Sequence, residues 1–324
     1  MGNPYDIADD DPEYLAMLKR YGVEPPQQKN AGQNSGWLGD TATGLKRGVQ
    51  QLPGMATGLA DIVASPISKV TGVNRPFSRA ADAVGEFTGF QPDKWQKAAQ
   101  QEYSPQLQED LRAVDKAEGF WGTTREALSR PRTISNLVAE AIPGTVAGGF
   151  LGRAAMGTVM GAEALAANRA ALAAGGAGAD AARTALVNAG VKAGALGEGV
   201  TQAGSQMSQL DYDIDPLRAA GTSALSGVTT GLLGYGGGKL AGRLGLQDME
   251  GAIAAGALRD TGRSGRGAYA RGILGGGVSE GVFEELPQGA TEQVWQNLAE
   301  GKPWDEGVGK AAAQSMLAGM AMGA

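Results

Sequence analysis

Three short stretches contain residue types that bind phosphates, calcium or dinucleotides in other proteins. In GYGGGKLAG, residues 234–242, a leucine follows the lysine where a phosphate loop needs serine or threonine. In DYDIDP, residues 211–216, Pro216 replaces the glycine of a calcium loop, and Thr222 stands in place of its bidentate glutamate. The segment GAGADA, residues 176–181, fits a dinucleotide fingerprint but follows no predicted strand. We expect loops or helix ends at all three, and no cofactor.

The composition excludes several classes of catalytic and metal site. The chain has no histidine and no cysteine, which removes Ser-His-Asp and Cys-His nucleophiles, zinc and iron–sulfur ligation by these residues, and disulfides. The 34 acidic residues leave carboxylate pairs possible, but nothing in the sequence singles one out. We therefore predict no metal site and no enzymatic activity for these residues, which leaves open an enzymatic domain elsewhere in a longer protein.

A local cluster of arginines interrupts an acidic chain whose net charge is −6. Such a charge gives no general attraction to nucleic acid. The stretch RDTGRSGRGAYARG, residues 259–272, is a candidate contact for phosphates of DNA or of lipid head groups. Its alternative interpretation is a solvated connector. The candidate contact residues are Arg259, Arg263, Arg266 and Arg271.

The elements that must position any site are helices with few large side chains. The chain has 53 glycines in 324 residues, against a usual share of about 7%, and only 6% aromatic residues. Apolar residues recur at helical steps between residues 38 and 62, and no run alternates like a strand. We predict an all-α fold in which Gly/Ala-rich helical hairpins pack closely. The periodicity predicts a kink at Pro53, a helix end at Pro66 and a helix start at Ser104-Pro105.

Composition divides the chain into four regions. Residues 1–36 form an N-terminal arm and linker, either a partner-docking segment or a disordered extension, and lack the pattern of a signal peptide. Residues 37–133 form an amphipathic helical region, and residues 134–246 a glycine-rich helical region. Residues 247–324 contain the basic connector and a C-terminal helical hairpin. The apolar run that stops at Ala324 without a polar cap suggests that the polypeptide continues.

Glycines four residues apart recur in the glycine-rich region. This spacing places them on one helical face, where two backbones can approach closely. Chance spacing in a glycine-rich chain is the alternative. The predicted helix-packing glycines are Gly144, Gly148, Gly152, Gly157, Gly161, Gly227, Gly231, Gly234, Gly238 and Gly242.

The same region is marginal as a membrane span. Residues 219–238 are uncharged over the length of a bilayer core, but they contain mostly glycine, serine, threonine and alanine. The stretch 142–167 is apolar around a single cation, Arg153, whose insertion at a helix centre costs about 2.5–3.5 kcal/mol. We expect residues 134–167 and 219–246 to form packed helices at rest and to enter lipid only after release.

Several segments together resemble a family of phage proteins. They are WLGDTATGLKRGVQQLPGMATGLADIVASP (37–66), the glycine-rich region, and SEGVFEELPQGATEQVWQNLAEGKPWDEGVGKAAAQSMLAGMAMGA (279–324). Residues 37–324 resemble the N-terminal part of the large internal virion proteins, or ejection proteins, of short-tailed bacteriophages. The resemblance implies a structural protein that lies inside the capsid near the portal. After ejection with the genome it would lie in the host cell envelope and help form a conduit for DNA.

The resemblance also implies partners, and the sequence leaves alternatives open. We expect a homo-oligomer that docks on portal or tail proteins and on other internal virion proteins. Phage DNA is a further candidate partner, as is the host membrane after ejection. The alternatives are a non-catalytic leader of an injected phage enzyme, such as a cell-wall hydrolase or an antirestriction protein, and a resident pore-forming membrane protein.

Overall fold

The computed structural model describes residues 36–88, 102–244 and 279–322, and over these residues the protein is all-α. Its 10 α-helices pack in pairs, and the described part contains no strand, so the predicted fold class is confirmed.

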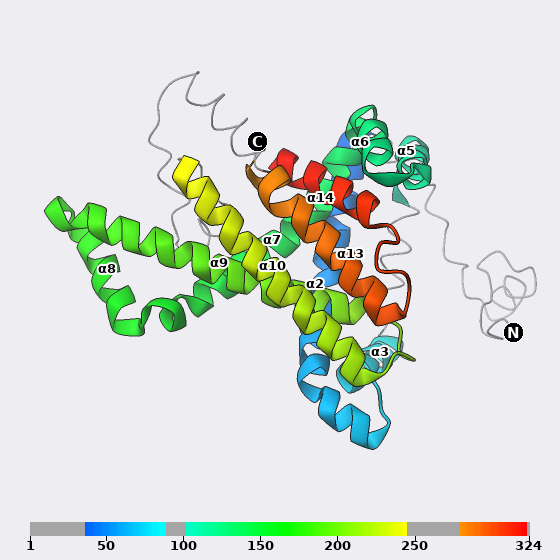
Figure 1. Cartoon of the computed structure of the whole chain (residues 1–324), viewed down its shortest axis with the longest axis horizontal. Helices are drawn as coiled ribbons and strands as arrows, with labels where there is room; N and C mark the ends of the chain where they lie inside the picture. Colours follow the sequence, from blue (N-terminus) through cyan, green and yellow to red (C-terminus); the bar gives the residue numbers. More distant parts are fainter. Residues whose placement is uncertain (1–35, 89–101, 245–278, 323–324) are drawn as a thin grey trace, which may run out of the picture.

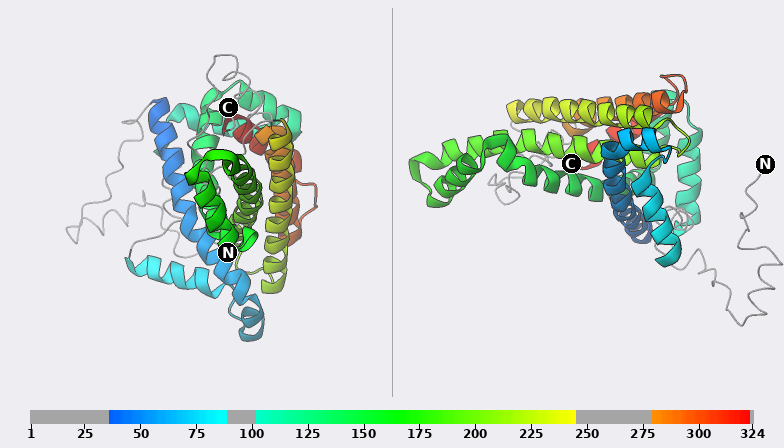
Figure 2. Two further views of the ribbon diagram at one scale, coloured as in Figure 1. Left: turned by 90° about the vertical axis from the view of Figure 1, so that its left-hand side faces the viewer. Right: turned by 90° about the horizontal axis from the view of Figure 1, so that it is seen from below.

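The centre of the molecule is the helix α9 (Ala179–Gln209). It packs against α2 (Trp37–Thr71), α7 (Pro131–Met160) and α10 (Pro216–Leu244), which surround it in the body of the molecule (Figure 1). The helix α8 (Ala162–Ala174) turns back along the beginning of α9. Together with the end of α7, these two helices form an arm that projects from the body in two of the views (Figures 1 and 2).

The C-terminal unit, which we define as η2, α13 and α14, covers one side of this centre. The π-helical segment η2 (Ser279–Glu285) leads into α13 (Leu286–Glu300), which packs on α10 and forms a hairpin with α14 (Val308–Met322). The helix α14 also contacts α6 and α7. The remaining short elements are α3 (Pro76–Thr88), α5 (Pro105–Lys116), α6 (Gly119–Leu128) and the 3-10 turn η1 (Gly176–Gly178).

The buried apolar side chains form three small clusters rather than one thick core. One lies in the arm and includes Met156 and Leu186, a second joins Val114 to Leu317, and a third surrounds Met207. Because large apolar side chains are few, most of the remaining contact between helices is made by small residues and by polar groups.

The helix boundaries follow the sequence in part. The Oγ of Ser104 accepts a hydrogen bond from the Leu107 backbone N–H at 3.2 Å, and Pro105 follows it, so the predicted start of α5 is confirmed. The predicted end at Pro66 is wrong. The helix α2 continues to Thr71 and ends at Gly72, whose φ of 72° is left-handed. A proline removes one backbone hydrogen bond, and the contacts between the end of α2 and α3 compensate for it.

Of the three motif-like stretches, two lie at helix ends as predicted and one does not. Residues 211–216 form the turn between α9 and α10, and residues 176–181 span η1 and the beginning of α9. Residues 234–242, which we expected to form a loop or a helix end, lie inside α10. Gly234 lies against the side chains of Glu198 and Glu284, and Gly237 against Glu284, so a larger residue at either position would collide with them.

Candidate functional site

The closest approach between helices is made by glycines of α7 and α9. A Cβ placed on Gly152 would lie 2.5 Å from the carbonyl oxygen of Ala193 and 3.0 Å from the Cα of Gly194. A Cβ on Gly197 would overlap the carbonyl oxygen of Gly148. Gly148 itself has slightly more room, with 3.5 Å to the backbone of Glu198. The two backbones therefore touch along two turns of helix, with no side chain between them.

The contact between α9 and α10 is built in the same way. A Cβ on Gly199 would overlap the carbonyl oxygen of Gly227, and a Cβ on Gly231 would lie 2.7 Å from the carbonyl oxygen of Ala195. Gly234 continues this face of α10, but there it faces the carboxylates of Glu198 and Glu284 rather than a backbone. The structure thus places five predicted glycines, Gly148, Gly152, Gly227, Gly231 and Gly234, at contacts of α9.

The other predicted glycines have different positions. Among the described residues, no heavy atom lies within 4 Å of a Cβ built on Gly144 or Gly157, and Gly144 lines a cavity described below. Gly161 has a φ of 86° and ends α7, which makes it a helix-end glycine and corrects its assignment to packing. Gly238 and Gly242 belong to α10, where their surroundings are outside the described part. The four candidate phosphate-contact arginines, Arg259, Arg263, Arg266 and Arg271, lie outside the described residues.

Sequence reasoning missed equivalent glycines in the first helix. In α2, Gly44 and Gly48 lie against α7, where a Cβ on Gly48 would reach the side chain of Pro143 at 2.8 Å. Gly58 meets Gly204 of α9, with the built Cβ 3.1 Å from the carbonyl carbon of Gly204. The signal was present, because Gly44 and Gly48 have the same four-residue spacing as the glycines of α7.

A buried ion pair joins α2 and α7 beside these glycines. The guanidinium of Arg47 donates to Oε1 of Glu140 at 2.5 Å, and the hydroxyl of Tyr103 donates to the same oxygen at 2.6 Å. Only 1% of Tyr103 is exposed. Burial and the neighbouring carboxylate raise the pKa of Tyr103 well above its usual value of 10, so the phenol stays protonated and holds Glu140 in place.

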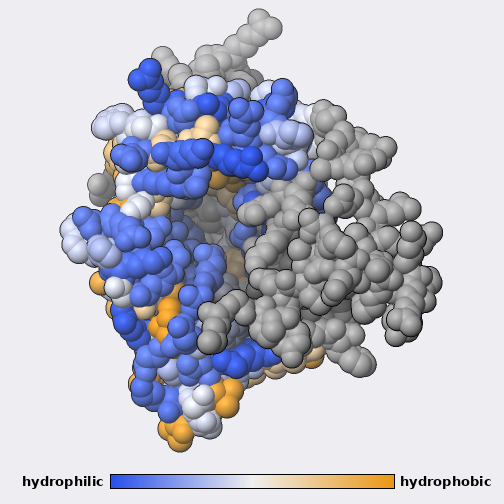
Figure 3. All heavy atoms as spheres, turned by 90° about the vertical axis from the view of Figure 1, so that its right-hand side faces the viewer, coloured by the Kyte–Doolittle hydropathy of each residue, from blue (hydrophilic) through white to orange (hydrophobic). Residues whose placement is uncertain are grey.

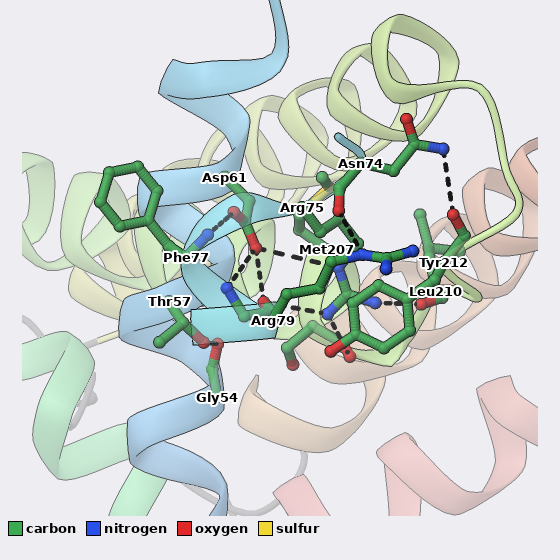
Figure 4. A network of polar contacts seen from close by, with 12 residues as sticks. Gly54, Thr57, Asp61, Asn74, Arg75, Phe77, Arg79, Met207, Leu210 and Tyr212 are labelled. Carbon is green, nitrogen blue, oxygen red and sulfur yellow. Dashed lines mark hydrogen bonds and ion pairs between the residues drawn. The ribbon is translucent and has the colours of Figure 1, made fainter. Parts of the chain in front are cut away.

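A second polar network fixes the corner between α2 and α3 to the end of α9 (Figure 4). The Asp61 carboxylate, 1% exposed, accepts hydrogen bonds from the backbone N–H groups of Phe77 at 2.8 Å and Ser78 at 3.1 Å. Arg75, at a φ of 52°, donates to the carbonyl oxygen of Leu210 and stacks 4.4 Å from the centre of the Tyr212 ring. This network joins α2, the beginning of α3 and the residues that follow α9.

A polar cavity of about 210 Å³ lies where α2, α7, α9, α10 and the C-terminal unit meet. Four carboxylates line it from four elements, together with glutamines, threonines and a serine. Among the described residues no group of three or more acidic side chains is placed to hold a metal ion. The lining carboxylates are Glu140 of α7, Glu198 of α9, Glu285 of η2 and Glu292 of α13.

Apolar side chains are exposed on three helices of the body. On α2, Val63, Ile67 and Val70 are 81%, 64% and 87% exposed. Figure 3 shows a largely hydrophilic face with apolar residues gathered at its lower end, the level at which α2 ends in Figure 1. The outer sides of α7 and α10 expose Phe150, Leu151, Leu225, Val228 and Leu232.

Within the described ranges, α7 is the one helix long and apolar enough to cross a membrane by length and composition. Only 28% of its most apolar window is buried. Arg153 lies in this helix and is exposed, and residues 219–238 of α10 do not pass the same test. The helix with the tightest glycine contacts is therefore also the one described helix that could cross a membrane by length and composition.

Comparison with known proteins gives no relative. No protein-family model, curated protein or solved structure matches this chain.

Proposed function

We propose that this protein is a structural component of a short-tailed phage virion, ejected with the genome, which helps form a conduit for DNA across the host envelope. The observation that carries the proposal is the contact between α7 and α9. The one described helix long and apolar enough to cross a membrane is held along its middle by backbone contacts at Gly148, Gly152 and Gly197, and large apolar side chains join the two helices only in the arm.

With this type of contact, α7 loses little free energy of apolar burial when it exchanges α9 for another partner. Burial of apolar area contributes roughly 25 cal/mol per Å², and a glycine face contributes little apolar area. When α7 leaves α9, the molecule loses close van der Waals contacts, which a second glycine face or lipid can replace. Phe150 and Leu151 already face outward on α7, so this helix presents apolar surface before any rearrangement.

We further propose that the chain assembles with copies of itself and with portal, tail or other internal virion proteins. Gly157 supports this proposal, because it is on α7 and no heavy atom of the described residues lies within 4 Å of a Cβ built on it. A small residue without a neighbour leaves room for a helix of another chain. Sedimentation of the purified protein tests this step: we expect a closed oligomer, and a monomer at every concentration would contradict it.

We assign no catalysis to these residues and place the protein in the virion near the portal before infection. The direct test is mass spectrometry of purified particles, followed by fractionation of infected cells. The proposal predicts this chain inside particles and, after infection, in the host envelope fraction. Its absence from purified particles would contradict the virion role and would favour a resident membrane protein.

A further inference from the structure

The cavity between α9, α10 and the C-terminal unit contains a carboxyl group with an unusual environment. Glu292 of α13 has one described hydrogen bond, from the hydroxyl of Thr230 on α10 at 3.4 Å. Among the described residues, no lysine or arginine forms an ion pair with it. Burial of this carboxyl raises its pKa to about 7, and the Thr230 hydroxyl opposes that shift because it donates to the charged form.

The other groups that face Glu292 do not compensate its charge. The carboxylates of Glu140, Glu198 and Glu285 line the same cavity from α7, α9 and η2. The nearest cation, Arg47 of α2, is bonded to Glu140 and Tyr103.

Cations on the two helices packed against α13 are also engaged. On α10, Arg218 donates to the carbonyl oxygen of Leu298, and Lys239 lies 4.5 Å from the centre of the Tyr235 ring. On α14, the only charged residue is Lys310, which is bonded to Asp115.

Around the cavity the contact between α13 and α10 is polar, whereas near the end of α13 it includes the apolar pair Ala299 and Ala219. The indole N–H of Trp295 on α13 donates to the Thr229 hydroxyl of α10 at 3.1 Å, and the amide of Gln288 reaches the Thr230 carbonyl oxygen at 3.5 Å. Glu292 is half-buried, and its ionised form adds a charge to a cavity that three other carboxyl groups line, with Thr230 as its one described donor. Like-charge repulsion and the hydration that the charge requires weaken the contact between the two helices around the cavity.

We infer that this cavity is a proton-operated joint: with Glu292 protonated, α13 stays docked on α10, and loss of the proton loosens that contact. The joint acts between two parts of one chain, so the inference goes beyond the proposed virion role and does not depend on it. A partner that binds the loosened form would be favoured at higher pH.

Hydrogen–deuterium exchange of the full chain, corrected for the intrinsic pH dependence of exchange, tests the joint. From about pH 6 to about pH 8, we expect the protection of α13 amides to fall about tenfold or more, with α9 amides unchanged. In Glu292→Gln, which keeps a hydrogen-bonding group without the proton equilibrium, this transition disappears. In the control Asp305→Asn, which removes an exposed carboxylate outside the cavity, it remains.

A second variant covers the case in which Glu292→Gln does not fold. Thr230→Val removes the one donor that favours the charged carboxylate, so the transition should move to higher pH. Unchanged protection of α13 in the wild type across this range would overturn the inference. A transition that persists in Glu292→Gln, or that Thr230→Val leaves at the same pH, would overturn it as well. None of these outcomes bears on whether the chain is found in virions.

Discussion

Gly197 of α9 and Gly148 of α7 lie so close that the carbonyl oxygen of Gly148 occupies the space a methyl group would need on Gly197. This pair fixes the distance between the two helices. It also determines the nature of their contact, because two backbones in contact bury little apolar area while gaining many van der Waals interactions. The helix pair is therefore intolerant of added atoms at this point, whereas nearer the arm the same two helices bury Met156 and Leu186 in one apolar cluster.

The first prediction concerns this pair. Gly197→Ala should destabilise the protein by about 1–3 kcal/mol, because the added methyl group must push the helices apart. Urea unfolding followed by circular dichroism measures the change.

The matched control is Gly221→Ala on α10, where a Cβ meets no atom within 4 Å. In a helix interior with open space, alanine should stabilise by up to about 1 kcal/mol relative to glycine. Two variants with the same sign of effect would contradict the account of α7–α9 packing.

The sequence predicted the all-α class and several glycine contacts because both depend on local spacing. Four-residue spacing places Gly227 and Gly231 on one face of α10 wherever that helix lies. The same spacing could not separate Gly152, which contacts α9, from Gly157, which contacts nothing, because only the partner helix distinguishes them. Glu292 lies in an amphipathic stretch and looks like a solvated residue. Its cavity exists only after α10 and α13 pack together.

The second prediction concerns the ion pair between α2 and α7. Glu140→Gln should cost about 3 kcal/mol of stability, because Arg47 keeps its charge in a partly buried position without a carboxylate. Tyr103→Phe removes the hydrogen bond donated to Glu140 and the one accepted from Arg47 but leaves the ion pair intact, and it should cost about 2 kcal/mol. Calorimetry of both variants measures the two losses of stability. A larger loss in Tyr103→Phe than in Glu140→Gln would contradict the prediction.

The third prediction concerns the corner between α2 and α3. Asp61→Asn removes the carboxylate that lies 3.9 Å from the buried Arg75 and that accepts the backbone N–H groups of α3. We expect a loss of about 3–5 kcal/mol, as for an uncompensated buried charge. Limited proteolysis should then cut first near residues 72–75. If Asp61→Asn resists cleavage near these residues as well as the wild type does, the network does not hold the corner.

The fourth prediction is the pH dependence of stability. The pKa of Glu292 is raised from 4.5 to about 7, so the folded state binds the proton more tightly than the unfolded state. Its contribution is fully present below pH 4.5 and is lost as the pH rises to about 7, by at most about 3 kcal/mol. Urea midpoints of wild type and Glu292→Gln should therefore diverge as the pH rises, with the variant more stable above pH 7. Parallel curves would contradict the assignment.

The fifth prediction concerns lipid. Arg153→Leu removes an exposed charge from α7, the one described helix that could cross a membrane, and should increase dye release from liposomes severalfold, because a charge costs up to about 2.5–3.5 kcal/mol on insertion. Arg169→Leu, an exposed arginine of α8, is the matched control and should leave dye release near the wild-type level. Equal effects of the two variants would show that α7 is not the inserting helix.

A reversible tether between α7 and α9 tests the central claim most directly. The chain has no cysteine, and a Cβ on Gly148 lies 3.6 Å from the Oγ1 of Thr201, so Gly148→Cys with Thr201→Cys can form one disulfide between the helices. The measurement is dye release from liposomes by this double variant, oxidised and then reduced. If α7 leaves α9 to enter lipid, the oxidised form releases little dye and reduction restores release. Equal dye release by the oxidised and reduced forms would contradict the claim.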